Sequence, residues 1–152
     1  MKIVVVSDNH GLEKPLEDVR RKHSDIQVLV HLGDSEFELA KLKGFIAVKG
    51  NNDFYPGYQR ARIIEVNEHR ILIIHGDGLF YGQNRDGLVA TAKDNDCDIV
   101  LFGHSHVFEH QIIDGITLIN PGSLNYNRDF SNPCYAIVDI EIDSVNVTRV
   151  DI

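Results

Sequence analysis

The chain has 152 residues, of which 43% are hydrophobic and 25% charged, the balance of an ordinary globular protein. This composition excludes a disordered, collagen-like or coiled-coil chain, and the length favours one domain over residues 1–152. Fifteen basic against 23 acidic residues give a formal net charge of −8. That charge argues against a broad nucleic-acid surface and an anionic membrane face, because both require clustered Lys and Arg.

The sequence carries no targeting or disulfide signal. Met1 and Lys2 lead directly into the run IVVV without a small-residue cleavage site, so we expect no signal peptide. No apolar run is long enough to span a membrane. Cys97 and Cys134 are far apart and match no CxxC spacing, which predicts neither a disulfide framework nor a thiolate metal site. We therefore expect a cytoplasmic protein.

Strands and helices are predicted to alternate along the first half of the chain. Five short, largely β-branched apolar runs are typical of buried strands: Ile3–Val6, Val28–Val30, Phe45–Val48, Ile71–Ile74 and Ile99–Phe102. Helices are predicted over Leu12–His23 and Asn84–Asn95, with a short one over Glu36–Lys43. The alternation of strand and helix predicts parallel βαβ units.

The second half is predicted to contain three hairpins, because turn residues separate pairs of strand-like segments. The pairs are Arg62–Val66 with Arg70–Ile74 around Asn67-Glu68, Glu109–Ile113 with Ile116–Ile119 around Asp114-Gly115, and Cys134–Ile142 with Val145–Val150 around Asp143-Ser144. Asn125–Pro133 is predicted as a long irregular loop. Together these elements predict an α/β fold in which a pair of mixed sheets is covered by helices.

Polar residues and glycines follow each of the five apolar strands. The segments are SDNHG at 7–11, HLGD at 31–34, KGNND at 49–53, HGD at 75–77 and GHSH at 103–106. Ligands of open α/β sheets bind beyond the carboxyl ends of the strands, so we expect these segments to form one pocket. The side chains expected to converge there are Asp8, His10, Asp34, Asn51, His75, His104 and His106.

This set of oxygen and imidazole donors, without a thiolate, suits Mn²⁺, Fe, Ni²⁺ or Zn²⁺ rather than Ca²⁺ or a structural zinc. Seven donors exceed the needs of one tetrahedral ion and suffice for two ions that share a bridging carboxylate. Two ions about 3.5–4 Å apart can hold the attacking and leaving oxygens of a phosphoryl displacement. The pattern therefore predicts metal-dependent phosphoryl chemistry.

Simpler explanations exist for each residue alone. A single His after a strand is more often a capping or hydrogen-bonding residue than a ligand, and GD or GN is ordinary turn chemistry. The metal hypothesis depends on the five segments together. His23, His69 and His110 lie in a predicted helix, turn and hairpin and are assigned no role. The sequence contains no P-loop, GxGxxG or GxSxG motif.

In chain order, the motifs SDNHG, GDSE, GNND, IHGD, GHSH and NPGS resemble those of the calcineurin-like metallophosphoesterases, most closely the small YfcE-type phosphodiesterases. The resemblance covers about Lys2 to Val150. It implies a four-layer αββα sandwich of two mixed sheets flanked by helices, with two divalent ions, most often Mn²⁺. It further implies that one ion is held by Asp8, His10, Asp34 and His106, and the other by Asp34, Asn51, His75 and His104, with Asp34 as the bridge.

The chain departs from that family at two positions. The branch usually reads HGH where this chain has His75-Gly76-Asp77. Larger phosphatases of the superfamily have a His that acts as general acid where this chain has Asn52, which cannot give up a proton at neutral pH. His31 is either a substitute acid or a residue that orients Asp34. Asp53 and Asp77 are further residues expected to support the ligands.

The sequence thus predicts a phosphodiesterase in which a hydroxide bridging two ions attacks phosphorus. Asn51 and Asn52 are expected to contact the phosphate, and Pro121-Gly122-Ser123 to shape the pocket floor. The expected partner is a small phosphoester, and a homo-oligomer is left open. A phosphomonoesterase with the same site is one alternative. A non-catalytic scaffold, such as the retromer subunit that resembles this family, is another, but all seven ligand positions here hold competent residues.

Overall fold

The computed structural model describes all residues from Met1 to Ile152. Ten strands, two α-helices and one 3₁₀ turn make up the chain. Their bounds are β1 Lys2–Val6, α1 Glu13–Lys22, β2 Val28–His31, the 3₁₀ turn Leu39–Leu42, β3 Phe45–Ala47, β4 Ala61–Val66, β5 His69–Ile74, α2 Asp86–Asp94, β6 Ile99–Leu101, β7 Phe108–Ile113, β8 Ile116–Pro121, β9 Cys134–Ile140 and β10 Val145–Asp151. Neither helix is long and apolar enough to cross a membrane.

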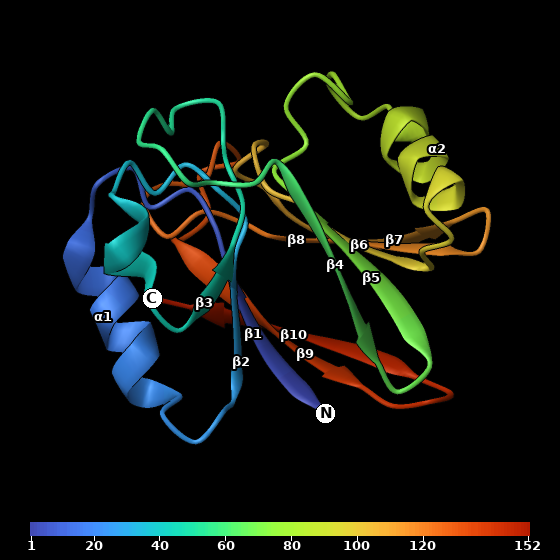
Figure 1. Cartoon of the computed structure of the whole chain (residues 1–152), viewed down its shortest axis with the longest axis horizontal. Coiled ribbons are helices and arrows are strands. Elements are labelled where there is room, and N and C mark those ends of the chain that lie inside the picture. The colour runs from blue at the N-terminus through green and yellow to red at the C-terminus, as the bar shows by residue number, and fades with distance from the viewer.

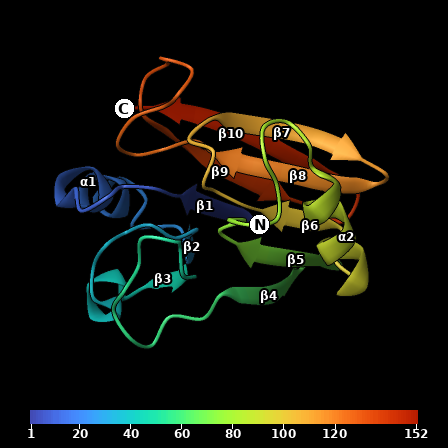
Figure 2. The ribbon, with the colours of Figure 1, turned by 90° about the horizontal axis from the view of Figure 1, so that it is seen from above.

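The strands form two five-stranded mixed sheets, in the orders β10-β9-β1-β2-β3 and β4-β5-β6-β8-β7. α1 lies on the outer side of the first sheet and α2 on the outer side of the second, as Figures 1 and 2 show from two directions. The layers therefore follow the order helix, sheet, sheet, helix. The α/β fold, with two mixed sheets flanked by helices, is confirmed.

The first sheet contains the predicted parallel units. β1 pairs in parallel with β2, and β2 with β3, while β9 and β10 continue the sheet antiparallel. The short helix predicted over Glu36–Lys43 is wrong, because only the single 3₁₀ turn Leu39–Leu42 forms there. Its backbone leaves the helical region at Lys43, where ψ is 130°.

Two of the three predicted hairpins are confirmed with the predicted turn residues. β4 and β5 join through Asn67 and Glu68, with φ of 47° and 70°, and β7 and β8 join through Asp114 and Gly115, with φ of 51° and 78°. Positive φ at both positions is what a two-residue type I′ hairpin turn requires, and the twist of such a turn matches that of the strands. The connection that follows β8, through Asn125–Pro133, contains no helix or strand, as predicted.

The third hairpin has a shifted turn. β9 ends at Ile140, and the Glu141 N–H donates to the Ser144 carbonyl at 2.9 Å. Ile142 and Asp143 therefore occupy the turn, one residue before the predicted Asp143-Ser144 pair, and the predicted strand Cys134–Ile142 is two residues too long. The error arose because Ile142 continues the apolar alternation, although its side chain is exposed in the turn.

The core lies in three layers because the central strands are buried on both faces. Ile3 and Val5 of β1 point into the space between the sheets, where they pack with residues such as Ile71 and Leu101 of the second sheet. The alternate residues of β1, Val4 and Val6, face α1. Such burial of Val, Leu or Ile stabilises a fold by about 1.5–3 kcal/mol per side chain. The central strands are therefore rigid supports for the loops at their carboxyl ends.

Candidate metal centre

The five motif-bearing segments meet at one edge of the paired sheets, at the top of the view in Figure 1. Five non-glycine residues in these segments have a left-handed backbone conformation. Their φ angles are 56° at Asp8, 44° at His10, 56° at Asp34, 70° at His104 and 55° at His106. A residue other than Gly is uncommon in this conformation, which costs on the order of 1 kcal/mol and persists only where the surroundings fix it. The fold therefore holds these five residues against their local preference.

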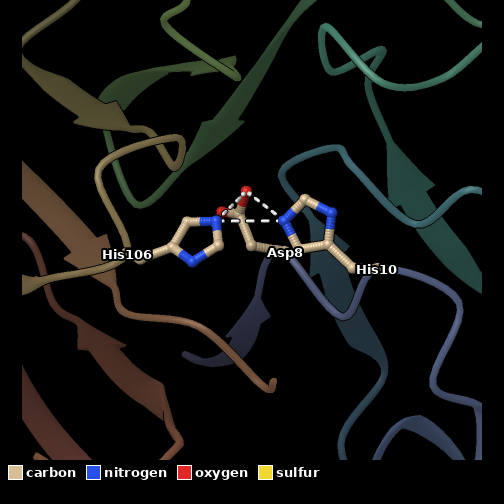
Figure 3. A group of neighbouring side chains, drawn as sticks. All are labelled: Asp8, His10 and His106. Atoms are coloured by element: carbon tan, nitrogen blue, oxygen red, sulfur yellow. Dashed lines mark hydrogen bonds and ion pairs between the residues drawn. The ribbon is translucent and has the colours of Figure 1, made fainter. Parts of the chain in front are cut away.

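One group of donors consists of Asp8, His10 and His106, shown in Figure 3. Asp8 Oδ1 lies 3.2 Å from His106 Nε2 and 3.7 Å from His10 Nε2. The two histidine Nε2 atoms lie 3.0 Å from each other. All three atoms point toward a common centre from the loop after β1 and the loop after β6, which are almost a hundred residues apart in the chain.

A second group shares Asp8 and adds Asp34 and His75. His75 Nε2 lies 3.5 Å from Asp34 Oδ2 and 3.9 Å from Asp8 Oδ1. Asp34 Oδ2 is also 3.9 Å from His10 Nε2 of the first group. Both carboxylates therefore reach histidines of both groups, which is the arrangement that a carboxylate shared by two ions requires.

Asn51 and His104 complete the predicted set. Asn51 Oδ1 lies 3.0 Å from His75 Nε2 and 3.1 Å from His104 Nδ1. The structure thus brings all seven predicted ligand residues together, with Asn51 and His104 at the more exposed side of the cluster.

Divalent ions fit this cluster because it contains an orphaned buried atom. Asp8 is fully buried, and its Oδ1 makes no hydrogen bond although histidine nitrogens surround it. A buried polar atom without a partner is costly and calls for an explanation, such as an ion that the site is built to hold. The oxygen and imidazole donors suit the transition metals expected from the sequence.

The charges of the cluster also favour the binding of cations. Burial raises the pKa of the Asp8 carboxyl, but the close contact with His106 and the charge of His75 outweigh burial and hold that pKa below its usual range. The pKa of Asp34 is lowered as well, since its contacts with His75 and Asn52 outweigh the effect of burial. Both groups are therefore carboxylates at neutral pH, ready to hold cations.

His75 carries a proton that a bound metal ion would replace. Burial lowers its pKa, but the hydrogen bond with Asp34 and the charge of Asp8 raise it to about 9 overall. The pKa of His104 is shifted in the other direction, because burial and the charge of His75 lower it. A proton on His75 compensates the buried carboxylates, and a metal ion binding there has to displace it.

Backbone carbonyls orient two of the histidines. His75 Nδ1 donates to the Leu32 carbonyl at 2.7 Å, and His106 Nδ1 donates to the Tyr126 carbonyl at 3.1 Å. With Nδ1 so engaged, each ring presents Nε2 to the cluster. Hydrogen bonds of this kind fix the tautomer and rotation of metal-binding histidines.

Asn52 and Asp53 support Asp34 and its loop. The Asn52 backbone N–H donates to Asp34 Oδ1 at 2.8 Å and its Nδ2 donates to Asp34 Oδ2 at 2.9 Å. Asp53 is fully buried and accepts the backbone N–H groups of Asp34, Glu36 and Gly50. Asn52 thus holds the carboxylate, and Asp53 holds the two loops together.

His31 lies behind the cluster. Its Nε2 donates to Asn9 Oδ1 at 2.8 Å, and its Nδ1 accepts the Gly33 N–H at 3.1 Å. Full burial lowers its pKa to about 4. The ring is therefore neutral, makes no hydrogen bond with the Asp34 carboxylate, and fixes the chain just before Asp34 instead.

Ser123 and Asp77 lie at the edges of the cluster. Ser123 is buried, and its Oγ donates to the Asp8 carbonyl at 2.8 Å, so it supports the left-handed turn at Asp8. Asp77 faces Arg60, whose Nη2 lies 3.3 Å from Asp77 Oδ2. A cation beside Asp77 was not foreseen from the sequence.

Sequence reasoning also missed three supporting residues. Ser7 Oγ donates to Asp8 Oδ2, and Asn120 Nδ2 donates to the Gly103 carbonyl at 2.9 Å and to Ser105 Oγ at 3.0 Å. Tyr126 acts through its carbonyl only. A Cβ at Gly50 would overlap Asp34 Oδ1, so the close approach of the two loops requires glycine there. Backbone carbonyls leave no trace in side-chain patterns, so Tyr126 could not have been found.

Comparison with known proteins shows the family of the chain. Residues 1–143 match the family model described as the calcineurin-like phosphoesterase superfamily domain. A relative from Bacillus subtilis, named probable metallophosphoesterase YsnB, is 31% identical over 99% of this chain and 91% of its own length. The chain therefore belongs to the calcineurin-like phosphoesterase superfamily.

Solved structures share the fold of this chain. A predicted phosphoesterase from Streptococcus pneumoniae is 32% identical, with a TM-score of 0.90 over 99% of this chain and 88% of that one. An archaeal protein described as a novel phosphodiesterase, at 22% identity and TM-score 0.77 over 99% of this chain and 100% of its own, shares the fold. So does zinc-complexed Vps29 of Entamoeba histolytica, at 24% identity and TM-score 0.77 over 99% of both chains.

Proposed function

We propose that this protein is a phosphodiesterase that works with two divalent transition-metal ions, Mn²⁺ in the first place and Ni²⁺, Fe or Zn²⁺ as alternatives. The observation that carries the proposal is the pair of overlapping donor groups around the orphaned Asp8 Oδ1. Asp34 Oδ2 lies within 3.9 Å of His10 and 3.5 Å of His75, one histidine of each group, and this arrangement suits two neighbouring ions better than one ion with seven ligands.

When bound, divalent ions would lower the pKa of a water and so supply the hydroxide needed for attack on phosphorus. The residues that would hold one ion are Asp8, His10, Asp34 and His106. Those that would hold the other are Asp34, Asn51, His75 and His104. Asn51 and Asn52 remain the proposed contacts to the phosphate, and Asn52 has one amide hydrogen left for it after bonding Asp34.

Protonation of the leaving group limits what this site can hydrolyse. Asn52 has no acidic proton, and His31 is buried, neutral and bonded to Asn9 and Gly33. Neither residue can act as the general acid that larger relatives of this superfamily use. We therefore expect esters with good leaving groups to be hydrolysed much faster than alkyl esters.

The phosphomonoesterase alternative uses the same donors and differs in substrate charge. A monoester dianion carries one more negative charge than a diester monoanion. Asp77 lies close to His104, where its charge acts on that ring, although Arg60 offsets part of it. This added negative charge favours diesters, which is why we place phosphodiesters first.

The scaffold alternative shares the fold but requires no intact donor set. Here all seven donors are present and converge, and five of them hold a strained backbone to do so. A scaffold without metal chemistry gains nothing from this strain or from the orphaned Asp8 Oδ1.

Parallel assays test the proposal. The metal-loaded protein is assayed with bis(p-nitrophenyl) phosphate and with p-nitrophenyl phosphate, which share a leaving group and differ in charge. We expect kcat/KM to be higher for the diester. A higher value for the monoester would favour the phosphomonoesterase, and no turnover of either by protein carrying two bound ions would favour the scaffold.

A further inference from the structure

A cavity of about 490 Å³ opens beside the metal centre. It lies between the loop that precedes α2 and the start of β7, and His104 forms part of its wall. His104 also contacts Asn51 of the metal centre, so the cavity and the candidate ion sites share a side chain. Its volume falls in the range of pockets that take small organic ligands.

Aromatic side chains line this cavity. Phe80 and Phe108 lie along its walls, and Tyr81, which is 83% exposed, stands beside them. The Phe80 ring meets the His104 ring edge to face, with centroids 5.9 Å apart. Aromatic side chains in a cavity wall bind planar rings of ligands by stacking, and such stacking tolerates many ring substituents.

A buried arginine at the cavity keeps a free donor. Arg85 is only 7% exposed, stacks over Phe80, and its Nε donates to both carboxylate oxygens of Glu109 at 3.1 and 2.9 Å. Its Nη1 donates to the Gly82 and Asn84 carbonyls. Its Nη2 donates no hydrogen bond within the chain, so this cavity-lining side chain has hydrogens available for a ligand.

A second cation stands nearby without a partner. The exposed guanidinium of Arg128 makes no ion pair or hydrogen bond, while its backbone N–H donates to the His106 carbonyl. Arg85 and Arg128 against Glu109 leave this cavity one positive charge, in a chain whose net charge is −8. The cavity is therefore suited to a ligand rich in hydrogen-bond acceptors.

We propose that this cavity is the subsite for one ester arm of the substrate, and that this arm carries a planar ring with hydrogen-bond acceptors, the chemistry of a nucleoside. The proposal rests on the phosphoesterase function proposed above. An apolar arm would leave the free donors of Arg85 and Arg128 unused. A bare anion would leave most of the aromatic wall and of the volume empty.

Inhibition by three monoesters tests this assignment without specifying which arm leaves. Thymidine 5′-monophosphate, phenyl phosphate and ethyl phosphate are compared as competitive inhibitors of bis(p-nitrophenyl) phosphate hydrolysis. We expect thymidine 5′-monophosphate to bind about tenfold more tightly than ethyl phosphate, with phenyl phosphate between them. Equal inhibition by thymidine 5′-monophosphate and ethyl phosphate, or by thymidine 5′-monophosphate and phenyl phosphate, would overturn the proposal.

Two exposed residues provide the variants. Tyr81→Ala and Arg128→Ala should each weaken binding of thymidine 5′-monophosphate about fivefold and leave that of ethyl phosphate unchanged. Phe130→Ala, at an aromatic that is 98% exposed and lies outside the cavity lining, is the matched control for Tyr81→Ala, and Arg62→Ala is the control for Arg128→Ala. Equal weakening of both inhibitors would contradict the subsite.

A measurement without turnover separates this proposal from the proposed function. Amide chemical shifts of the metal-free protein are followed by NMR as thymidine 5′-monophosphate or ethyl phosphate is added. Shifts at Tyr81, Gln83 and Arg128 with the nucleotide only would support the subsite even if no diester were hydrolysed. Diester hydrolysis without such shifts would uphold the phosphodiesterase and overturn the subsite.

Discussion

Asn52 holds both carboxylate oxygens of Asp34, one through its backbone N–H at 2.8 Å and the other through its side-chain amide at 2.9 Å. The family resemblance of the sequence implies a general acid at this position in larger phosphatases, whereas here the side chain fixes a candidate bridging ligand. Asn52 therefore cannot protonate the leaving group, but it can affect metal affinity through Asp34.

Replacing Asn52 with Ala should lower metal affinity about tenfold to a hundredfold, because hydrogen bonds that orient a ligating carboxylate contribute on that scale. The backbone bond to Asp34 Oδ1 remains in this variant. Isothermal titration with Mn²⁺ measures the effect, and Asn146→Ala on β10 is the control. Unchanged affinity with reduced turnover would assign Asn52 to the phosphate alone.

Asp34→Asn should lose more metal than His106→Ala. A bridging carboxylate serves both ions and its charge offsets their mutual repulsion, whereas His106 contacts only the group around Asp8 and His10. Metal content by mass spectrometry should fall below one ion per chain in Asp34→Asn and stay near one in His106→Ala. If Asp34→Asn kept both ions while His106→Ala lost one, Asp34 would not be the bridge.

Asp77 and Arg60 should shift substrate preference in opposite directions. The Asp77 carboxylate repels the extra negative charge of a monoester. For two unit charges about 7 Å apart at an effective dielectric of about 20, this repulsion is about 2.4 kcal/mol before salt screening, and about 1 kcal/mol after it. Asp77→Asn should therefore raise kcat/KM for a monoester relative to a diester up to about fivefold. Arg60→Ala, which frees the Asp77 charge, should lower that ratio. Identical changes for both substrates would remove Asp77 from substrate selection.

His69 should make stability depend on pH away from the metal centre. Its Nδ1 donates to Asp98 and its Nε2 to the Glu141 carbonyl, so both ring nitrogens face acceptors and the bond to Asp98 raises the pKa of His69. A raised folded pKa stabilises the protein fully below the unfolded value of about 6.5, and this contribution is lost as pH rises through the folded pKa.

Thermal melts of wild type and His69→Gln between pH 5 and 9 measure this contribution. The difference in Tm should be largest at pH 5 to 6 and shrink toward pH 9. His110→Gln, at an exposed His of β7, is the control. A Tm difference that is constant over this range would show that folding does not shift the pKa of His69.

Much of the fold was predictable because each strand is marked by a local pattern of apolar residues. Runs such as Ile3–Val6 are buried on both faces and end in Gly, Asp or His, which reveals both the parallel strands and the edge where they finish. The third hairpin was misplaced because Ile142 extends the apolar alternation into the turn. Only the Glu141 to Ser144 hydrogen bond shows where β9 ends.

The convergence of the seven proposed donors and the supporting place of Asp53 were predictable, whereas most other supporting contacts were not. His10 and His106 follow strands, and strand ends can be read from sequence. The roles of Asn120, Arg60 and the Tyr126 carbonyl depend on contacts between segments far apart in the chain. His31 could not be assigned between an acid and a support until its partners Asn9 and Gly33 were seen.

The most direct test of the account is hydrolysis of bis(p-nitrophenyl) phosphate by protein stripped of metal with a chelator, before and after Mn²⁺ is restored. In this account Asp8, Asp34 and the four histidines act as ligands of the ions, and the nucleophile would be a water that the ions activate. We predict no activity above background in the stripped protein and full recovery as two ions per chain are restored. Undiminished hydrolysis by rigorously metal-free protein would contradict the metal centre as the site of catalysis.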